Sequence, residues 1–367
     1  MNAQFDRQVL AEALGIAATV AAARTPKPIL QCLKIETAKD IAFISATDLE
    51  LSIRHAIKHV EVRKPGEVVV RAETLTQIVK ECHDETLALE TVKNNLHIRG
   101  KGSHFQIVTH DPQEFPPVAQ MEGSADFTIE LGVLRRMIEW TNYASARESS
   151  RYAINGVLWE LAGEHLTLVA TDGRRLAYAR GTVTAQASGN VPTTIVPSRA
   201  MKLLLQLVAN SDEQVGVKMT PNQFLINAGP ALISGAVVDG HFPDYRKVMP
   251  EKSTKLATIK TGEFQGALRQ AALLTSEESR AVRLTFGDGS LLLSSRAPEQ
   301  GESSITLPVK YEGEPIDIGF NPVFLMDVLR VASTDEINFG LTEPNRPGLL
   351  QTGPDFQYVI MPVSLSA

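Results

Sequence analysis

The sequence predicts an α+β protein built from three copies of one domain. The segment FISATDLELS carries Thr47 and Asp48, and LVATDGRRLAY carries Thr171 and Asp172, so the pair recurs after 124 residues. A further 124 residues reach Ser295, where another apolar run breaks into a polar turn. Solenoid repeats recur after roughly 20 to 50 residues, so a period this long is that of a whole small domain. We expect domains over 1–124, 125–253 and 254–367, with polar linkers near 123–127 and 251–255.

Other landmarks recur with a similar step. The tripeptide EFP at 114–116 returns as HFP at 241–243, each closing an apolar run before a loop that contains proline. Predicted helices begin near Val9, Leu134 and Ala267, and each is followed by an arginine in a loop and then by a strand; these arginines are Arg24, Arg151 and Arg280. The repeat therefore extends over whole domains and is not confined to one turn.

The first repeat shows the expected order of elements. Residues 6–22 read as a helix with one apolar stripe, and the segments 27–38, 41–49 and 51–57 alternate at period two, as strands do. A turn and a strand follow at 64–72, then a second helix at 73–83 and a strand meander over 87–111. The same order returns over 127–245 and 257–362. Because most strands are apolar on one face only, we expect the helices to cover one face of each sheet.

Composition narrows the class of protein. Hydrophobic residues make up 43% and charged residues 21% of the chain, which is ordinary for globular domains. No apolar run reaches the roughly 18 residues of a membrane span, and the start lacks the basic segment of a signal peptide. Cys32 and Cys82 lack metal-binding spacing and lie among apolar residues, so we expect buried thiols. These features predict a cytoplasmic protein with no membrane partner.

The distribution of charge is more informative than its sum of −6. Several predicted helices carry lysine or arginine, namely Arg135, Arg136, Arg199, Lys202, Arg269 and Arg330. A protein that is acidic overall but basic on one set of helices could bind DNA on that face and repel it elsewhere. Ordinary solvated helix faces explain the same pattern, so charge alone leaves both interpretations open.

A search for catalytic chemistry finds little. There is no P-loop, GxGxxG, GxSxG or HExxH motif, and His55 and His59 lie on a predicted strand, where that spacing does not converge on a metal. The best candidates for a hydrolase are the carboxylates of Asp48 and Asp172. Each belongs to a Thr-Asp pair at a strand end, where such pairs commonly close a turn by bonding backbone amides. We therefore expect no enzyme, no metal site and no cofactor.

The remaining signal is a recognition surface. Arg174 and Arg175 precede Leu176, the segment HFPDYRKVMP mixes apolar and basic residues, and the chain ends in the apolar YVIMPVSLSA. Apolar residues flanked by basic ones in turns suit a groove for a short extended peptide.

The motifs ATDGRRLA, SRYAINGVLWE, FPDYRKVMP and YVIMPVSL resemble those of the bacterial sliding clamp family, the beta subunit of DNA polymerase III. RTPKPIL, ATDLEL, ESRAVRL, PEQGE and IGFNPVFLMDVL match that family too, in order along the chain. The resemblance implies a processivity factor: a head-to-tail homodimer forming a six-domain ring around double-stranded DNA, with helices lining the hole. It also implies as partners the DNA polymerase III alpha subunit, the clamp loader complex and other proteins with a clamp-binding motif.

The resemblance assigns residues to three surfaces. The partner-peptide groove would use Ile154, Thr171, Gly173, Arg174, Arg175, Leu176, Pro243, Lys247, Val248, Phe324, Val359, Met361, Pro362 and Val363. The DNA-facing set would include Arg24 and Tyr152, and the dimer interface would pair Phe105 with Leu273 and Leu274 of the other chain. We expect Leu176, Val248, Val359 and Met361 to line a dry pocket. Arg175 is expected to hold its charged head at the rim and not to form a buried ion pair.

The chain departs from the family in places. Ser364 replaces a familiar basic residue, Ser366 and Ala367 extend past the usual terminal leucine, and Glu73 and Glu148 stand where basic or neutral DNA-contacting residues are common. These departures motivate an alternative, namely a specialised clamp paralogue or a scaffold with the clamp fold that does not support bulk replication.

Overall fold

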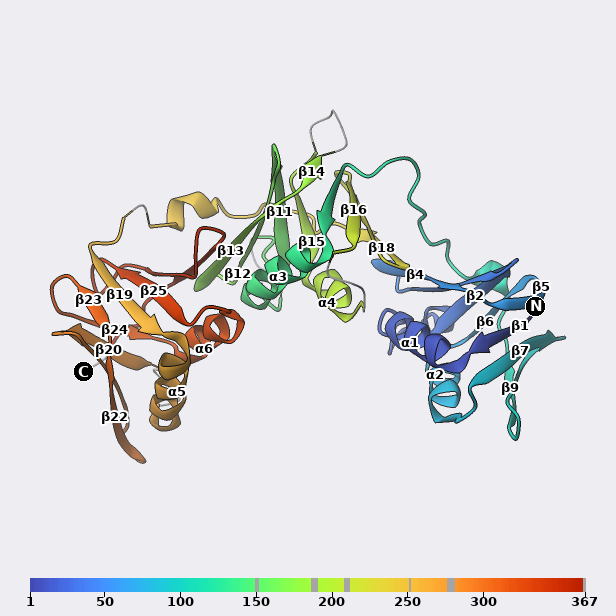
Figure 1. Cartoon of the computed structure of the whole chain (residues 1–367), viewed down its shortest axis with the longest axis horizontal. Coiled ribbons are helices and arrows are strands. Elements are labelled where there is room, and N and C mark those ends of the chain that lie inside the picture. The colour runs from blue at the N-terminus through green and yellow to red at the C-terminus, as the bar shows by residue number, and fades with distance from the viewer. Residues whose placement is uncertain (149–151, 186–190, 208–211, 251, 276–280, 366–367) are drawn as a thin grey trace. The chain divides into compact units, whose positions relative to one another are not determined.

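The computed structural model describes residues 1–148, 152–185, 191–207, 212–250, 252–275 and 281–365 (Figure 1). The chain divides into two compact units. Unit 1 consists of Met1–Val133 and Val183–Val237, and unit 2 consists of Leu134–Thr182 and Val238–Ala367. The central repeat is thus shared: residues 134–182 and 238–253 belong with the C-terminal repeat, and residues 125–133 and 183–237 belong with the N-terminal repeat.

Within the described residues the helices come two to a repeat, as the sequence predicts. They are α1 (Arg7–Ala18), α2 (Ala72–Glu81), α3 (Leu131–Thr141), α4 (Ser198–Gln206), α5 (Thr261–Ala271) and α6 (Pro322–Val331). Short 3₁₀ turns include η1 (Pro28–Gln31), η3 (Asn142–Ala144), η4 (Tyr245–Val248) and η5 (Ala272–Leu274). Helix α1 begins where the Asp6 side chain accepts a hydrogen bond from the Val9 amide (3.0 Å), as N-cap residues do.

Unit 1 contains two antiparallel sheets. The larger has the order β14 (Thr184–Ala185), β10 (Phe127–Glu130), β16 (Gln214–Met219), β17 (Gln223–Ala228), β18 (Ala231–Ala236), β4 (Leu51–Lys58), β3 (Ile41–Thr47), β2 (Cys32–Ala38) and β6 (Gly66–Arg71). The smaller has the order β5 (Glu61–Lys64), β1 (Asn2–Asp6), β7 (Thr86–Val92), β8 (Asn95–Arg99) and β9 (His104–Val108). Helices α1 and α2 pack side by side, α1 against β3 and β4 and α2 against β2 and β6 (Figure 1).

Unit 2 repeats this plan. One sheet runs through β11 (Gly156–Ala162), β12 (His165–Thr171), β13 (Arg175–Thr182), β27 (Phe356–Ile360), β26 (Gly348–Gln351), β25 (Glu336–Leu341), β19 (Lys255–Lys260) and β23 (Lys310–Glu312). The other has the order β22 (Gly301–Pro308), β21 (Ser290–Ala297), β20 (Val282–Gly287) and β24 (Ile316–Phe320). Helices α5 and α6 pack together, and α5 also contacts β21 and β22 (Figure 1).

One hydrogen bond recurs in all three repeats and confirms that they share a fold. The first amide of each repeat's first helix donates to the carbonyl of the residue just before β7, β16 or β25. The pairs are Arg7 to Glu85 (2.9 Å), Leu131 to Glu213 (2.9 Å) and Thr261 to Asp335 (2.8 Å). The same helix start therefore meets the same strand start three times, which confirms the three-copy prediction.

Strand pairing joins neighbouring repeats at two places. At the first junction, in unit 1, β4 of the first repeat pairs with β18 of the central repeat, with Ile53 opposite Ile233. At the second junction, in unit 2, β13 of the central repeat pairs with β27 of the last repeat, with Ala177 opposite Tyr358. Both pairs are antiparallel and follow a Thr-Asp turn, so the two junctions are structurally equivalent.

Two expected boundaries were wrong. Residues 28–31 form the 3₁₀ turn η1 and not a strand, because Pro28 lacks a backbone N–H and starts such a turn readily. The first helix ends at Ala18 and does not reach residue 22. There the amide and the hydroxyl of Thr19 both donate to the Ile16 carbonyl (3.1 and 2.7 Å), so a tightened last turn ends the helix.

Candidate functional site

The turn between β12 and β13 is fixed by its own side chains. The Thr171 hydroxyl donates to the Arg175 carbonyl (2.6 Å) and accepts from the Gly173 amide (3.1 Å). One Asp172 oxygen accepts from the amides of Arg174 (3.0 Å) and Arg175 (3.1 Å). These bonds confirm the structural interpretation of the Thr-Asp pair, since the carboxylate is engaged in closing the turn.

The Arg175 side chain corrects an expectation. It does not hold its head at the rim: its side chain is only 10% exposed, and its guanidinium forms two ion pairs. Nε donates to Asp172 (3.0 Å), one terminal nitrogen donates to Asp327 on α6 (2.6 Å), and the other donates to the Tyr143 carbonyl (2.9 Å). Because the guanidinium does not reach solvent, its charge is neutralised inside the protein by Asp172 and Asp327.

Two aromatic rings lie close to this guanidinium. Its central carbon lies 4.4 Å from the centre of the Phe324 ring and 5.5 Å from that of Tyr143. Burial acts to lower the pKa of Arg175, but contacts with Tyr358, Asp327 and Asp172 outweigh it and raise the pKa. Arg175 therefore stays protonated at every pH at which the protein is folded.

The pairing of β13 with β27 brings the C-terminal segment beside the turn. Leu176 lies opposite Val359, and the Met361 amide donates to the Arg174 carbonyl (2.9 Å). Both Leu176 (3% exposed) and Val359 (2%) are buried, whereas 40% of Met361 is exposed. Beyond them, the Val363 amide bonds the Gly319 carbonyl (2.8 Å) next to the half-buried Pro362.

A loop from the end of the central repeat adds the remaining predicted residues. Tyr245 donates to Glu160 on β11 (2.8 Å), and Arg246 pairs with the same oxygen (2.5 Å), so η4 is tied to the sheet. The hydrogen bond from Arg246 lowers the pKa of Glu160. Val248 is 46% exposed, Lys247 is exposed and Pro243 is half-buried.

The other predicted residues are placed as follows. The Ala153 amide bonds the His241 carbonyl (3.1 Å), which places buried Ile154 next to the segment that holds Pro243. Exposed residues include Arg24 in unit 1, Tyr152 (46%) in unit 2, Phe105 (37%) on β9 and Leu273 (76%) on η5; Leu274 is half-buried, and Glu73 and Glu148 are exposed. Arg151, Arg280, Ser366 and Ala367 lie outside the described residues.

Three residues that organise this surface were missed by sequence reasoning: Asp327, Tyr143 and Glu160. Asp327 could have been suspected, because it lies one helical turn after Phe324 and one turn before Arg330, with which it also pairs (3.2 Å). The carbonyl of Tyr143 and the carboxylate of Glu160 leave no such pattern in the sequence, since their partners are distant along the chain.

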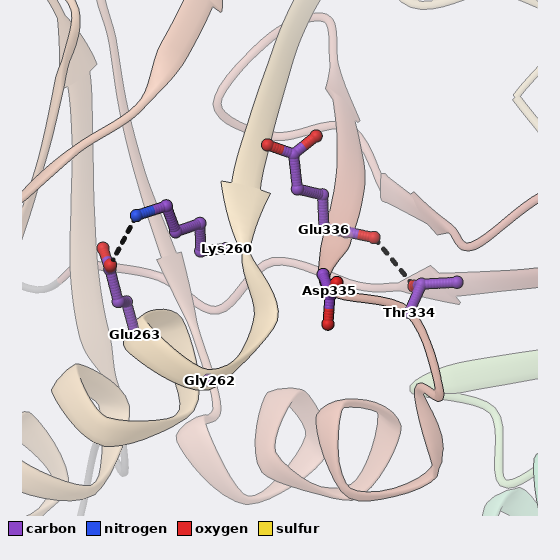
Figure 2. A pocket seen from close by; sticks show the side chains of 6 residues that line it. All are labelled: Lys260, Gly262, Glu263, Thr334, Asp335 and Glu336. Carbon is purple, nitrogen blue, oxygen red and sulfur yellow. Dashed lines mark hydrogen bonds and ion pairs between the residues drawn. The ribbon is translucent and has the colours of Figure 1, made fainter.

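Figure 2 shows a separate hollow of about 700 Å³ in unit 2, at the start of α5. It is lined by Lys260, Gly262, Glu263, Thr334, Asp335 and Glu336. Lys260 pairs with Glu263 (2.9 Å), and the carboxylates of Asp335 and Glu336 point away from each other (Figure 2). Across the described residues there is no group of three or more His, Cys, Asp and Glu side chains that could hold a metal ion. Nor does any helix described here have the length and apolar character to cross a membrane.

Comparison with known proteins covers the whole chain. Residues 1–119, 128–244 and 246–364 match the N-terminal, central and C-terminal domains of the DNA polymerase III beta subunit. The chain is 31% identical over 369 residues to a "Beta sliding clamp" of Pseudomonas aeruginosa, covering all of both chains. A crystal structure of a sliding clamp from that organism bound to griselimycin has a TM-score of 0.94 at 30% identity, and a Bacillus subtilis clamp has 0.94 at 26%, each with full coverage of both chains.

Proposed function

The chain belongs to the DNA polymerase III beta subunit family and is a DNA sliding clamp; we propose that two copies close a ring around duplex DNA and tether partners at the second junction. The full-length match to curated beta sliding clamps favours this function over a scaffold or specialised paralogue. A ring that cannot leave DNA without opening raises the local concentration of a bound polymerase. We place this activity in the cytoplasm, with the clamp loader and the polymerase alpha subunit as partners.

The main support for a ring is the pattern of strand pairing at the two junctions between repeats. In each, the strand after the turn pairs with the last strand of the next repeat's meander: β4 with β18, and β13 with β27. The equivalent strands of the third and first repeats are β22 and β9. Each lies at the edge of its sheet, with one neighbour. We propose that a third junction of the same kind forms between two chains, head to tail, and that two such contacts close the ring.

The repeat symmetry also gives the register of this contact. Ser303 lies opposite Ser295, as Leu176 lies opposite Thr171. Phe105 lies opposite Ile98, as Tyr358 lies opposite Leu350. Since Ala177 faces Tyr358 at the second junction, Ser304 should face Phe105 of the partner subunit, with Ser303 opposite Gln106 of the partner subunit. The 3₁₀ turn η5, which contacts β21 and β22, places exposed Leu273 beside this edge.

Two experiments test the interface. Changing Leu273 and Leu274 to aspartate should yield a folded monomer in light scattering, because each buried leucine contributes about 1.5–3 kcal/mol. Oxidation of Ser303→Cys with Gln106→Cys should give a covalent dimer, whereas Ser303→Cys with His104→Cys, two residues out of register, should not. The native Cys32 and Cys82 are buried and should not form disulfides in this assay. A leucine double variant that remains dimeric would rule out this interface.

The mode of DNA binding follows from the ring. Exposed Arg24 and Tyr152 are proposed to face the duplex with few phosphate contacts, so direct affinity should be weak and should fall with salt. After loading, a nicked circle should retain the protein, while the linearised DNA should lose it through its free ends. Equal retention on both would indicate ordinary groove binding and would contradict the ring.

The partner surface is proposed to bind an extended peptide that carries a glutamine and terminal leucine or phenylalanine side chains. Met361 and Val248 supply exposed apolar area beside the rigid turn, with Pro243 and Pro362 stiffening the walls. Deleting residues 361–367 should abolish peptide binding and polymerase stimulation, while light scattering still shows a dimer. Binding by the truncated protein as tight as by the full chain would place the site elsewhere.

We propose that the protein has no catalytic activity of its own. The strongest candidates for a hydrolase were Asp48 and Asp172, and one oxygen of each accepts two backbone amides of its own turn. The second oxygen of each is paired with an arginine, Arg199 or Arg175. Both oxygens of each carboxylate are thus used within the protein, which supports a structural role in closing the turn.

A further inference from the structure

We propose that Asp327 is a positioning residue of the partner surface: its ion pair with Arg175 sets the distance between the Thr-Asp turn and α6, and so shapes the surface without contacting the peptide. This inference rests on the proposed function. Asp327 comes from the last repeat and Arg175 from the central one, 152 residues apart. Their contact is the one ion pair across the second junction among the described residues.

The hydrogen bonds of Arg175 argue against direct recognition of a peptide. Three of its nitrogens already donate, to Asp172, Asp327 and the Tyr143 carbonyl, and only 10% of its side chain is exposed. Its flat face is covered by Phe324 at 4.4 Å. A guanidinium in this state offers a partner little surface and serves to hold the segments around it.

Asp327 is the residue through which the Arg175 network contacts helix α6. It lies on α6 one turn after Phe324, whose carbonyl accepts a hydrogen bond from Tyr358 (3.0 Å). Tyr358 in turn pairs with β13 through Ala177. Helix α6 is thus linked to β13 at two points. The first is Tyr358, whose hydroxyl bonds α6 while its backbone pairs with β13. The second is the ion pair between Asp327 and Arg175. Removing the ion pair between Asp327 and Arg175 should let α6, and Phe324 with it, shift relative to the turn.

The environment of Asp327 suits a structural ion pair. Its side chain is 16% exposed, one oxygen bonds Arg175 (2.6 Å) and the other bonds Arg330 (3.2 Å). Arg330 is 72% exposed and belongs to the same helix, so its loss should not move α6. The chain therefore offers a matched control on the same carboxylate.

The test uses the full-length protein and a fluorescein-labelled peptide that contains a glutamine and a terminal Leu-Phe, followed by polarisation and stopped flow. Asp327→Asn should weaken binding about tenfold, through a slower association and an unchanged dissociation rate, because a smaller fraction of molecules is competent. Arg330→Met should change affinity less than about twofold. Asp327→Glu, which keeps the charge, should recover most of the association rate.

Several outcomes would overturn the proposal. They are an Asp327→Asn affinity within twofold of the unmodified protein, a faster dissociation at unchanged association, and an Asp327→Glu variant no better than Asp327→Asn. Tryptophan fluorescence at the assay temperature checks that each variant is folded, since Trp140 and Trp159 both lie in unit 2. If the unmodified protein binds no peptide, the proposed function fails; if it binds and Asp327→Asn binds equally, only this inference fails.

Discussion

The two junctions share one turn, closed by the same hydrogen bonds, but they differ in the side chains around that turn. At the first, the Thr47 hydroxyl donates to the Leu51 carbonyl (3.2 Å), and Asp48 accepts from the amides of Glu50 (3.1 Å) and Leu51 (2.8 Å). These are the bonds that Thr171 and Asp172 make at the second junction, 124 residues later. The hydrogen bonds that close the turn are therefore the same whichever side chains surround it.

The difference lies in the side chains that the turn presents. Leu51, buried at 5% exposure, stands where the second junction has Arg175. Asp48 finds its cation on another element, Arg199 of α4, which is 48% exposed, whereas Arg175 is 10% exposed. The first junction thus combines a buried leucine with an ion pair to a half-exposed arginine, and the second has a largely buried charge network. At the end of the paired strand the second junction has a large exposed apolar side chain, Met361, whereas the first has the small Ala236.

The largest expected effect breaks the buried network. Arg175→Met leaves Asp172 and Asp327 facing each other in a largely buried place, and should destabilise unit 2 by about 3–5 kcal/mol. Arg199→Met, at the equivalent turn, should cost about 1 kcal/mol or less because the Arg199 side chain is 48% exposed and solvent screens its charge. Urea unfolding followed by tryptophan fluorescence reports on unit 2, and circular dichroism on both units. Similar losses for the two variants would erase the distinction between the junctions.

A smaller effect concerns the third residue of each turn. Gly173 has φ of 86°, and Leu49 has φ of 82° at the same place. A Cβ added at Gly173 meets nothing within 4 Å, so Gly173→Ala should cost only the left-handed backbone strain, about 1–2 kcal/mol. Leu49→Gly removes that strain but increases the conformational entropy of the unfolded chain. Its free energy of unfolding should therefore stay within about 1 kcal/mol of that of the unmodified protein. Thermal unfolding measures both, and a neutral Gly173→Ala would show that the turn tolerates the strain.

The smallest effect should be a pH dependence confined to the first junction. His55 on β4 is 7% exposed, its Nδ1 has no hydrogen-bond partner, and burial lowers its pKa from 6.5; the equivalent residue on β13 is Ala179. Since the unfolded chain binds the proton more readily, the stability that neutral His55 contributes is complete above pH 6.5 and is lost as pH falls below it.

The matched comparison is His55→Gln, followed by circular dichroism between pH 7 and pH 5. The melting temperature of the unmodified protein should fall more steeply over this range than that of the variant. Parallel slopes for the two proteins would mean that His55 does not carry the dependence.

The sequence by itself determined the three-fold repeat, the α+β class and the closure of both Thr-Asp turns. These features are readable because their causes are local. Helix and strand periodicity spans a few residues, and every hydrogen bond that closes the Thr171 turn joins residues at most four apart. The positive φ at the third residue of the turn is local too, since Leu49 and Gly173 both adopt it in turns closed by the same hydrogen bonds.

Only the tertiary structure decided where charges and apolar side chains of the partner surface lie. Sequence reasoning placed Arg175 at a rim because arginine usually keeps its head in water, but pairing of β13 with β27 brings Asp327 to it from 152 residues away. The same pairing buries Leu176 and leaves Met361 exposed. The physical reason is that burial and charge pairing depend on which distant strands meet, and no local pattern along the chain records that choice.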